Sequence, residues 1–350
     1  MHEEEKKKNR TIQLLRIVGS PFNAPTDAPG SESEAEELYE YASKNRIAQL
    51  YLQALKKQNS SMYLEAERCR LDERYDDLLR SVGRISYLLE NLRVEHAIFK
   101  TVRPYLAATA DIDLLVFGRE YPRSIKAMLQ YGYKVEPKGY GPESATLFDE
   151  RWQIKIDVYK EIAASHIVYL DKEKIRQYVT RETLQNGMFF YSLKRNADLI
   201  AIIGHSVIKE QMYCLGEYYT FLYYLATMNE EEVRGFIDLV KENRIIRAAT
   251  SYIGVTAILH QAAHGVVPGI CKRIMAELGS DLFEGSRLAK NAFYLPHKYH
   301  IITVLKTMKN MLWERKFRES VATQLVSMLR PSFTLQFVNE IVTHVVRETY

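Results

Sequence analysis

The residues best suited to chemistry form a short acidic motif in residues 109–116, with the sequence TADIDLLV. Side chains two apart on a β-strand point to the same face, so Asp111 and Asp113 would project together. Ile112 and Leu114 would then enter the core. Two carboxylates this close repel each other unless a cation lies between them, and oxygen ligands suit Mg²⁺. The motif therefore predicts a metal site. The alternative is that it is only the exposed end of a strand.

A further carboxylate lies in the alternating segment 153–159, QIKIDVY. Asp157 shares a strand face with Lys155, whereas its apolar neighbours point the other way. Charged groups rarely lie in the middle of a strand without a partner. If this strand lies beside the Asp111 strand, three carboxylates converge as in a two-metal site for phosphoryl or nucleotidyl transfer. A salt bridge from Asp157 to a lysine is the alternative, and a lysine lying between the carboxylates would contradict the metal site.

A basic segment precedes the acidic motif. Residues 97–104, AIFKTVRP, predict a strand, a turn and the start of a helix. The N-terminus of a helix offers unpaired N–H groups and a positive dipole end, and proline suits its first turn. Lys100, Thr101 and Arg103 would add two cations and a hydroxyl there. We expect a triphosphate to bind at this point, with a solvated charged turn as the alternative.

The elements that must position these groups change along the chain. The first 93 residues favour helices, including one opened by a Ser33–Glu36 capping box and continuing to about Lys57, and an amphipathic helix over residues 61–92. Short strands, a helix ended by Gly132 and a hairpin then predict a compact α/β unit over residues 94–162. After a strand at residues 188–193, Asn196 is expected to cap a helix from Ala197. The rest is nearly all helical, interrupted at Pro268, Pro296 and Pro331.

The fold class expected from this order is α+β, a small mixed sheet flanked by N-terminal helices and a larger C-terminal helical domain. The predicted division has four segments: a charged, partly flexible 1–33, a helical 34–93, an α/β core 94–193 and a helical 194–350.

Composition narrows the function classes. The chain has 350 residues, 47% hydrophobic and 26% charged, which is typical of a globular protein. Its net charge of +4 permits an anionic ligand without requiring one. The three cysteines have no zinc-binding spacing. No apolar run is long enough to span a membrane, so we expect a cytoplasmic protein without a membrane partner.

These motifs, in this order, resemble the DNA polymerase beta-type nucleotidyltransferase superfamily, and more closely its uncharacterised nucleotidyltransferase branch. The matching residues are Phe99-Lys100, the Asp111–Val116 strand, Tyr131-Gly132-Tyr133, Ile156-Asp157-Val158 and Asp198 to His205. The likeness covers roughly residues 35–255. The resemblance implies a nucleotidyltransferase core that uses Mg²⁺ or Mn²⁺ to transfer a nucleoside monophosphate from a nucleoside triphosphate, such as ATP, to a hydroxyl, releasing pyrophosphate.

The resemblance also implies roles. Asp111 and Asp113 would bind both metals, and Asp157 would complete one metal site and help to activate the attacking hydroxyl. Lys100, Thr101, Arg103 and Lys155 are the expected nucleotide-binding residues. Two departures concern the nucleotide more than the metal. Lys100-Thr101 replaces the Gly-Ser or Gly-Gly of the phosphate turn, and residues 107–108 are alanines where the superfamily often has an arginine.

Two weaker signals lie further along. His205 would share a helix face with Asp198 and Lys209, either contacting the nucleotide or acceptor or serving as an interdomain histidine. Residues 297–318 are basic with interspersed aromatics, which indicates either contacts to a nucleic-acid backbone or a solvated helix face.

The acceptor stays open among RNA, protein and a small molecule. Two other functions compete with the enzyme: an inactive module of the same fold that binds nucleotide or RNA, and a nucleic-acid-binding protein whose acidic trio is structural.

Overall fold

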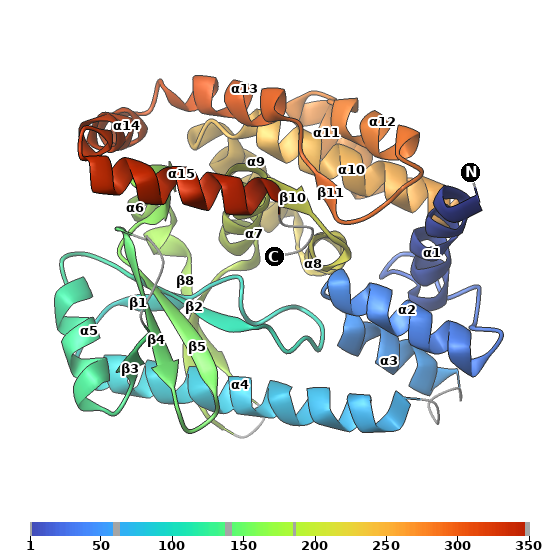
Figure 1. The fold of residues 1–350 in the computed structure, drawn as a ribbon, viewed down its shortest axis with the longest axis horizontal. Helices are drawn as coiled ribbons and strands as arrows, with labels where there is room; N and C mark the ends of the chain where they lie inside the picture. The colour runs from blue at the N-terminus through green and yellow to red at the C-terminus, as the bar shows by residue number, and fades with distance from the viewer. Residues whose placement is uncertain (1, 59–63, 137–141, 185–186, 347–350) are drawn as a thin grey trace.

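The computed structural model describes residues 2–58, 64–136, 142–184 and 187–346. Within them the chain forms 15 α-helices and a mixed seven-stranded sheet, which agrees with the expected α+β class. The sheet lies between a single long helix on one side and the C-terminal helices on the other (Figure 1). No helix of the described ranges is long and apolar enough to cross a bilayer.

The N-terminal part consists of four helices: α1 (His2–Val18), α2 (Glu32–Lys44), α3 (Ala48–Lys57) and α4 (Glu65–Asn91). The predicted start of α4 near Ser61 lies outside the described residues. Leu78, Val82, Ile85 and Leu89 form the apolar stripe of α4 and are fully buried. They pack beneath the sheet, along the lower edge of the molecule in Figure 1.

Two predictions about α2 and α3 were wrong. The cap is Ser31, whose Oγ accepts from the N–H of Glu34, rather than Ser33 with Glu36. The single helix expected up to Lys57 is broken at Arg46, which has a left-handed φ of 63°. The N–H of Ile47 donates back to the carbonyl of Ala42 at 2.9 Å, which closes the helix end as in a Schellman motif. Glycine usually occupies this position, and because arginine stands here no residue type marks the end of the helix.

The sheet has the order β3-β4-β5-β2-β1-β9-β8. Its strands are β1 (His96–Ile98), β2 (Asp111–Val116), β3 (Lys134–Val135), β4 (Ser144–Asp149), β5 (Ile154–Tyr159), β8 (Val179–Thr183) and β9 (Phe189–Leu193). Helix α5 (Tyr121–Gln130) links β2 to β3, and the predicted hairpin is the antiparallel pair β4–β5. Between β5 and β8 lie the hairpin β6 (Ile162–Ala164) and β7 (Ile167–Leu170), then α6 (Lys172–Ile175).

The helix predicted after the first strand is absent. Residues 99–110, all of them described, form bends and extended chain between β1 and β2. The physical reason is that Lys100 takes a left-handed φ of 58°, and its N–H is bound by the distant carboxylate of Asp198 at 2.7 Å. A tertiary contact therefore sets this turn, and no helix N-terminus is available to hold a triphosphate.

The C-terminal part covers the other face of the sheet. Its elements are α7 (Arg195–Gly204), a π-helical turn (His205–Lys209), β10 (Met212–Tyr213), α8 (Leu215–Thr227), α9 (Glu230–Glu242), α10 (Ile246–His264), α11 (Gly269–Leu278), α12 (Phe283–Lys290), β11 (His297–Lys298), α13 (Ile301–Met311), α14 (Arg315–Met328) and α15 (Pro331–Val346). The prediction that Asn196 caps α7 was wrong. Asn196 lies inside the first turn, and Lys194 precedes the helix.

Two apolar cores lie on the two faces of the sheet. The smaller lies between the sheet and the helices α4 and α5. The larger contains Leu14, Leu50, Leu115 and Tyr219, one from each of the four predicted segments. The segments therefore share a core across this face. Their exact division into domains stays a prediction.

Candidate functional site

A cleft of about 820 Å³ opens between the sheet and the helices that cover its ends. Side chains of β2, β4 and β5 form one wall, and the α2–α3 junction and α4 form another. The π-helical turn and the start of α8 form a third. Each wall comes from a different part of the sequence, so only the tertiary fold creates the cleft.

The three predicted aspartates lie on the strand wall. Strands β2 and β5 are parallel neighbours, in a register that pairs Asp113 with Asp157 and Asp111 with Lys155. The apolar residues between them, including Ile112 and Ile156, are fully buried in the core on the opposite face. Asp157 therefore lies on the same face as the other two, as expected, and all three line the cleft.

The strand wall concentrates negative charge. Burial, with the nearby carboxylates of Asp113 and Asp157, raises the pKa of Asp111 to about 6. The cations of Lys100 and Arg46 act in the opposite direction without cancelling this effect. Asp157 also accepts a hydrogen bond from the hydroxyl of Thr146, its register partner on β4. Like charges held this close cost free energy, which a cation in the cleft would recover.

The side chain of Lys100 supplies one positive charge beside these carboxylates. This side chain is 4% exposed, and its Nζ lies 3.1 Å from Oδ1 of Asp113. The same ammonium lies 5.3 Å from the centre of the Tyr159 ring at the end of β5. Burial and the nearby Lys209 lower the pKa of Lys100. A lysine paired with these carboxylates counts against a metal site. The single ammonium of Lys100 does not offset the negative charge fully, however, because the pKa of Asp111 stays raised.

The other predicted nucleotide-binding residues divide into two groups. Arg103 and Lys155 line the cleft. The guanidinium of Arg103 donates to Thr220 on α8 at 3.2 Å, and Lys155 pairs with Glu136 at 2.6 Å. Thr101 does not line the cleft. Its buried hydroxyl accepts from the N–H of Asp113 at 2.8 Å and donates to the carbonyl of Phe99, so it holds β2 in position.

A cationic wall faces the aspartates, and its cations are Arg46, Lys100, Arg103 and Lys209. His205 lies at its centre, where burial and the charges of Lys100, Lys209, Arg46 and Arg103 lower its pKa well below the usual value. The wall lines the same cleft as the aspartates, and Lys209 donates to the Tyr159 hydroxyl at 3.3 Å. The cleft thus has an acidic side and a side rich in cations, where Glu210 lies 3.4 Å from His205 and 3.9 Å from Lys209.

Sequence reasoning found this wall only in part. His205 and Lys209 were weighed as site residues on one helix face, but their helix changes to a π-helical turn at His205. Such turns are frequent at functional sites. Arg46 was missed altogether, because nothing in the sequence marks the break that turns it toward the cleft.

The strand wall fits a divalent cation in its donor chemistry, since three carboxylates offer the oxygen ligands that Mg²⁺ and Mn²⁺ take. It does not fit as a finished ligand set. Among the residues that the structure describes, no three His, Cys, Asp or Glu side chains are grouped so that they could hold a metal ion. Metal binding would therefore require Lys100 to leave Asp113 and the carboxylates to close in.

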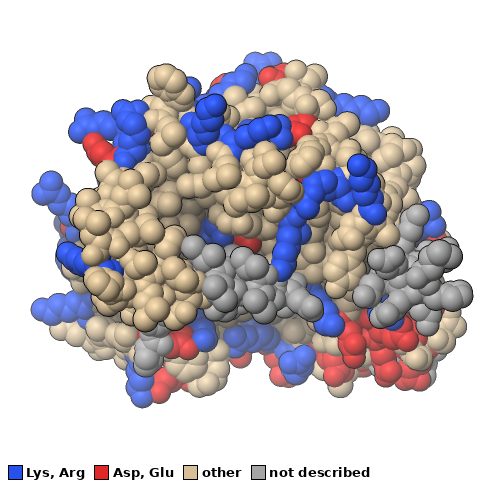
Figure 2. Space-filling view, turned by 45° about the horizontal axis from the view of Figure 1, so that its top comes forward, with Lys and Arg blue, Asp and Glu red and all other residues tan. Residues whose placement is uncertain are grey.

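Several residues of the basic stretch 297–318 are occupied within the fold, whereas Lys298, Lys306 and Lys309 are exposed. His297 and Tyr299 are buried, and Lys316 pairs with Glu161 and Asp171 at 2.9 Å each. Arg315 pairs with Glu319 on its own helix. On the face shown in Figure 2, lysine and arginine side chains form several separate groups, one of which is a continuous run.

The sequence was compared with known proteins, and it matches no protein-family model and no curated protein.

Proposed function

We propose that the cleft catalyses metal-dependent nucleotidyl transfer, moving a nucleoside monophosphate from a nucleoside triphosphate to a hydroxyl with release of pyrophosphate. The observation that carries the proposal is the pairing of an acidic and a cationic side in one cleft. Two neighbouring strands carry the aspartates Asp111, Asp113 and Asp157. The ammonium groups of Lys100 and Lys209 both lie against Tyr159, the last residue of β5. A triphosphate with its divalent cation is complementary to these two sides, because the metal ion would face the carboxylates and the phosphates would face the cations.

The residues of the cleft would divide the work. The three aspartates would hold Mg²⁺ or Mn²⁺, which when bound supplies Lewis-acid stabilisation of the reacting phosphate. Lys100 would leave Asp113 and bind the phosphate chain together with Lys209. Thr146 would keep the Asp157 carboxylate oriented, as its hydrogen bond does now. Arg103 and Lys155, which also line the cleft, would contact the rest of the nucleotide.

The second candidate is a nucleotide-binding module without catalysis. The ion pair between Lys100 and Asp113 favours it, because the lysine already supplies a cation where a metal would bind. In such a module the phosphate would still bind to the cationic wall. It would do so without a divalent ion.

Incubation with each labelled nucleoside triphosphate and Mg²⁺ or Mn²⁺, with and without bulk RNA, tests the enzyme directly. We expect label on RNA or on the protein, lost in Asp113→Asn. Calorimetry of nucleotide binding separates the candidates. Binding that needs a divalent ion supports the enzyme. Binding that is equal in EDTA, with no transfer, supports the module.

A further inference from the structure

A second cavity, of about 620 Å³, lies between the end of α12 and β11. Three cations line it: Arg287 and Lys290 from α12, and Lys298 from β11. Asn291 and Tyr294 add polar groups, and no acidic residue is among those that line the cavity. This basic pocket therefore favours an anionic ligand.

The nearest acidic group is already neutralised. Glu284 is fully buried beside the pocket and accepts hydrogen bonds from His297 at 2.8 Å and Arg287 at 3.0 Å. It also accepts from the N–H of His300 at 2.9 Å and from the Thr303 hydroxyl at 2.5 Å. The ion pair with Glu284 offsets the charge of Arg287, so the excess positive charge of the lining residues comes from Lys290 and Lys298.

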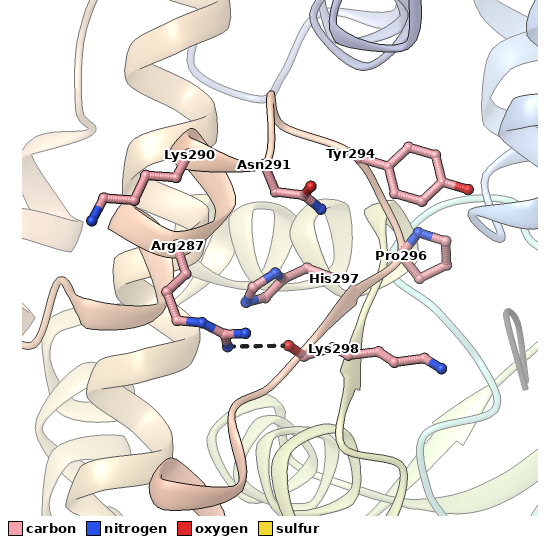
Figure 3. A pocket seen from close by; sticks show the side chains of 7 residues that line it. All are labelled: Arg287, Lys290, Asn291, Tyr294, Pro296, His297 and Lys298. Atoms are coloured by element: carbon pink, nitrogen blue, oxygen red, sulfur yellow. Dashed lines mark hydrogen bonds between the residues drawn. The ribbon is translucent and has the colours of Figure 1, made fainter. Parts of the chain in front are cut away.

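The cations are spread along the basic pocket. In Figure 3, Lys290 and Lys298 point to opposite ends, and the Arg287 guanidinium lies between them, against the carbonyl of Lys298. A single phosphate ion is best held by donors that converge on one point. Cations in a row match the successive phosphates of a chain instead. Both lysines are exposed at the surface.

The basic pocket adjoins the acidic cleft. Lys298 and His297 pair with Met212 and Tyr213 in the two-stranded ribbon β10–β11. Glu210, two residues before β10, and Gly216, three residues after it, line the cleft. The ribbon β10–β11 therefore connects the basic pocket to elements of the cleft wall.

We propose that the basic pocket binds the phosphate backbone of a single-stranded nucleic acid, which is the acceptor for transfer in the cleft. This inference deepens the proposed function and, as to the acceptor, rests on it. Binding itself uses Arg287, Lys290 and Lys298 and needs none of the three aspartates.

The test uses the full chain and a short fluorescein-labelled oligouridylate, with fluorescence anisotropy measured over a series of salt concentrations. Each phosphate contact contributes about 0.7 to the slope of log Kobs against log salt for a single strand. The double variant Lys290→Gln/Lys298→Gln should therefore lower the slope by about 1.4 and weaken binding. The matched control is Lys306→Gln/Lys309→Gln, which removes two exposed charges from α13.

Weakening by the pocket pair and not by the α13 pair would support the proposal. Equal weakening by both pairs, no binding by the unmodified chain, or equally tight binding of an oligoglutamate of matched charge would overturn it. Asp113→Asn separates the two proposals. We expect it to keep oligouridylate binding and lose transfer. If the unmodified chain binds the oligonucleotide through the pocket but transfers nothing, the proposed function fails and the binding site stands.

Discussion

The molecule holds a fully buried carboxylate and a half-buried one in two opposite environments. Glu284, between α12 and β11, is surrounded by donors from His297, Thr303 and the backbone of His300, which together lower its pKa to about 2 despite its burial. Asp111, half-buried on the cleft wall, has its pKa raised to about 6 by burial and by the nearby carboxylates of Asp113 and Asp157. The charged form of Glu284 is therefore stabilised by its surroundings, and that of Asp111 is not.

This difference separates a structural carboxylate from a functional one. A buried charge whose hydrogen bonds are satisfied fastens elements together, and Glu284 joins α12 to β11 and α13 in this way. A buried charge kept among like charges persists only where the rest of the fold maintains it, and such groups cluster at binding and catalytic sites. The environment of Asp111, rather than its residue type, is what marks the cleft.

The largest expected effect is on transfer. Asp113→Asn and Asp157→Asn should each reduce the rate by more than about 100-fold, because even the outer partners of metal ligands cost 10–100-fold when they are changed. Glu284→Gln should leave the rate per folded molecule nearly unchanged. Single-turnover kinetics with labelled triphosphate measure both. Comparable losses in Glu284→Gln and the aspartate variants would erase the distinction between the two environments.

The next effect is on stability, and it reverses the ranking. Glu284→Gln should lower the free energy of unfolding by about 3–5 kcal/mol, because it leaves donors around a fully buried position without their ionic partner. Asp111→Asn, by contrast, removes like-charge repulsion and should stabilise the fold at pH 7. Denaturant unfolding followed by circular dichroism would show this. Stabilisation by Glu284→Gln would contradict the structural role.

The pH dependence of unfolding should differ in sign between the two groups. The raised pKa of Asp111 means that the folded chain binds the extra proton between about pH 4 and 6, so its contribution falls by up to about 3 kcal/mol as the pH rises through that window. The lowered pKa of Glu284 gives stability above about pH 4.5 that is lost as the pH falls toward 2. Asp111→Asn should abolish only the loss of stability between about pH 4 and 6. If the free energy of unfolding of this variant depended on pH above 4 as in the unmodified chain, the pKa of Asp111 would not be raised in the folded state.

The smallest expected effect concerns Lys100. Lys100→Gln removes the ammonium from Asp113 and should raise the affinity for Mn²⁺ alone by at least about fivefold, an energy of about 1 kcal/mol. The same change should lower the affinity for the triphosphate. Lys160→Gln, whose partner Glu143 lies outside the cleft, is the matched control. Unchanged Mn²⁺ affinity by calorimetry would favour the non-catalytic module.

Periodicity predicted much of the strand wall. The alternation in residues 111–116 and 153–159 fixed the faces of Asp111, Asp113 and Asp157, because side chains on a strand alternate whatever else surrounds it. The long amphipathic helix under the sheet followed from its apolar stripe for the same reason. These features depend on local geometry alone.

The cationic wall and the turn before β2 were beyond such reasoning. Arg46 and Lys100 both take left-handed backbone angles that sequence patterns assign to glycine. A local hydrogen bond from Ile47 to Ala42 closes the helix end at Arg46, whereas a distant carboxylate holds Lys100. The carboxylate of Asp198, 98 positions away, fixes the Lys100 turn and replaces the expected helix. Long-range hydrogen bonds of this kind leave no periodic trace in the sequence.

The sequence by itself therefore determined which side chains share a strand or helix face. The tertiary structure decided what those faces meet: Lys100 with Asp113, and the cations around His205 with the acidic strands. The physical reason is that side-chain direction follows from backbone geometry within one element. The electrostatic state of a buried group depends on every element packed around it.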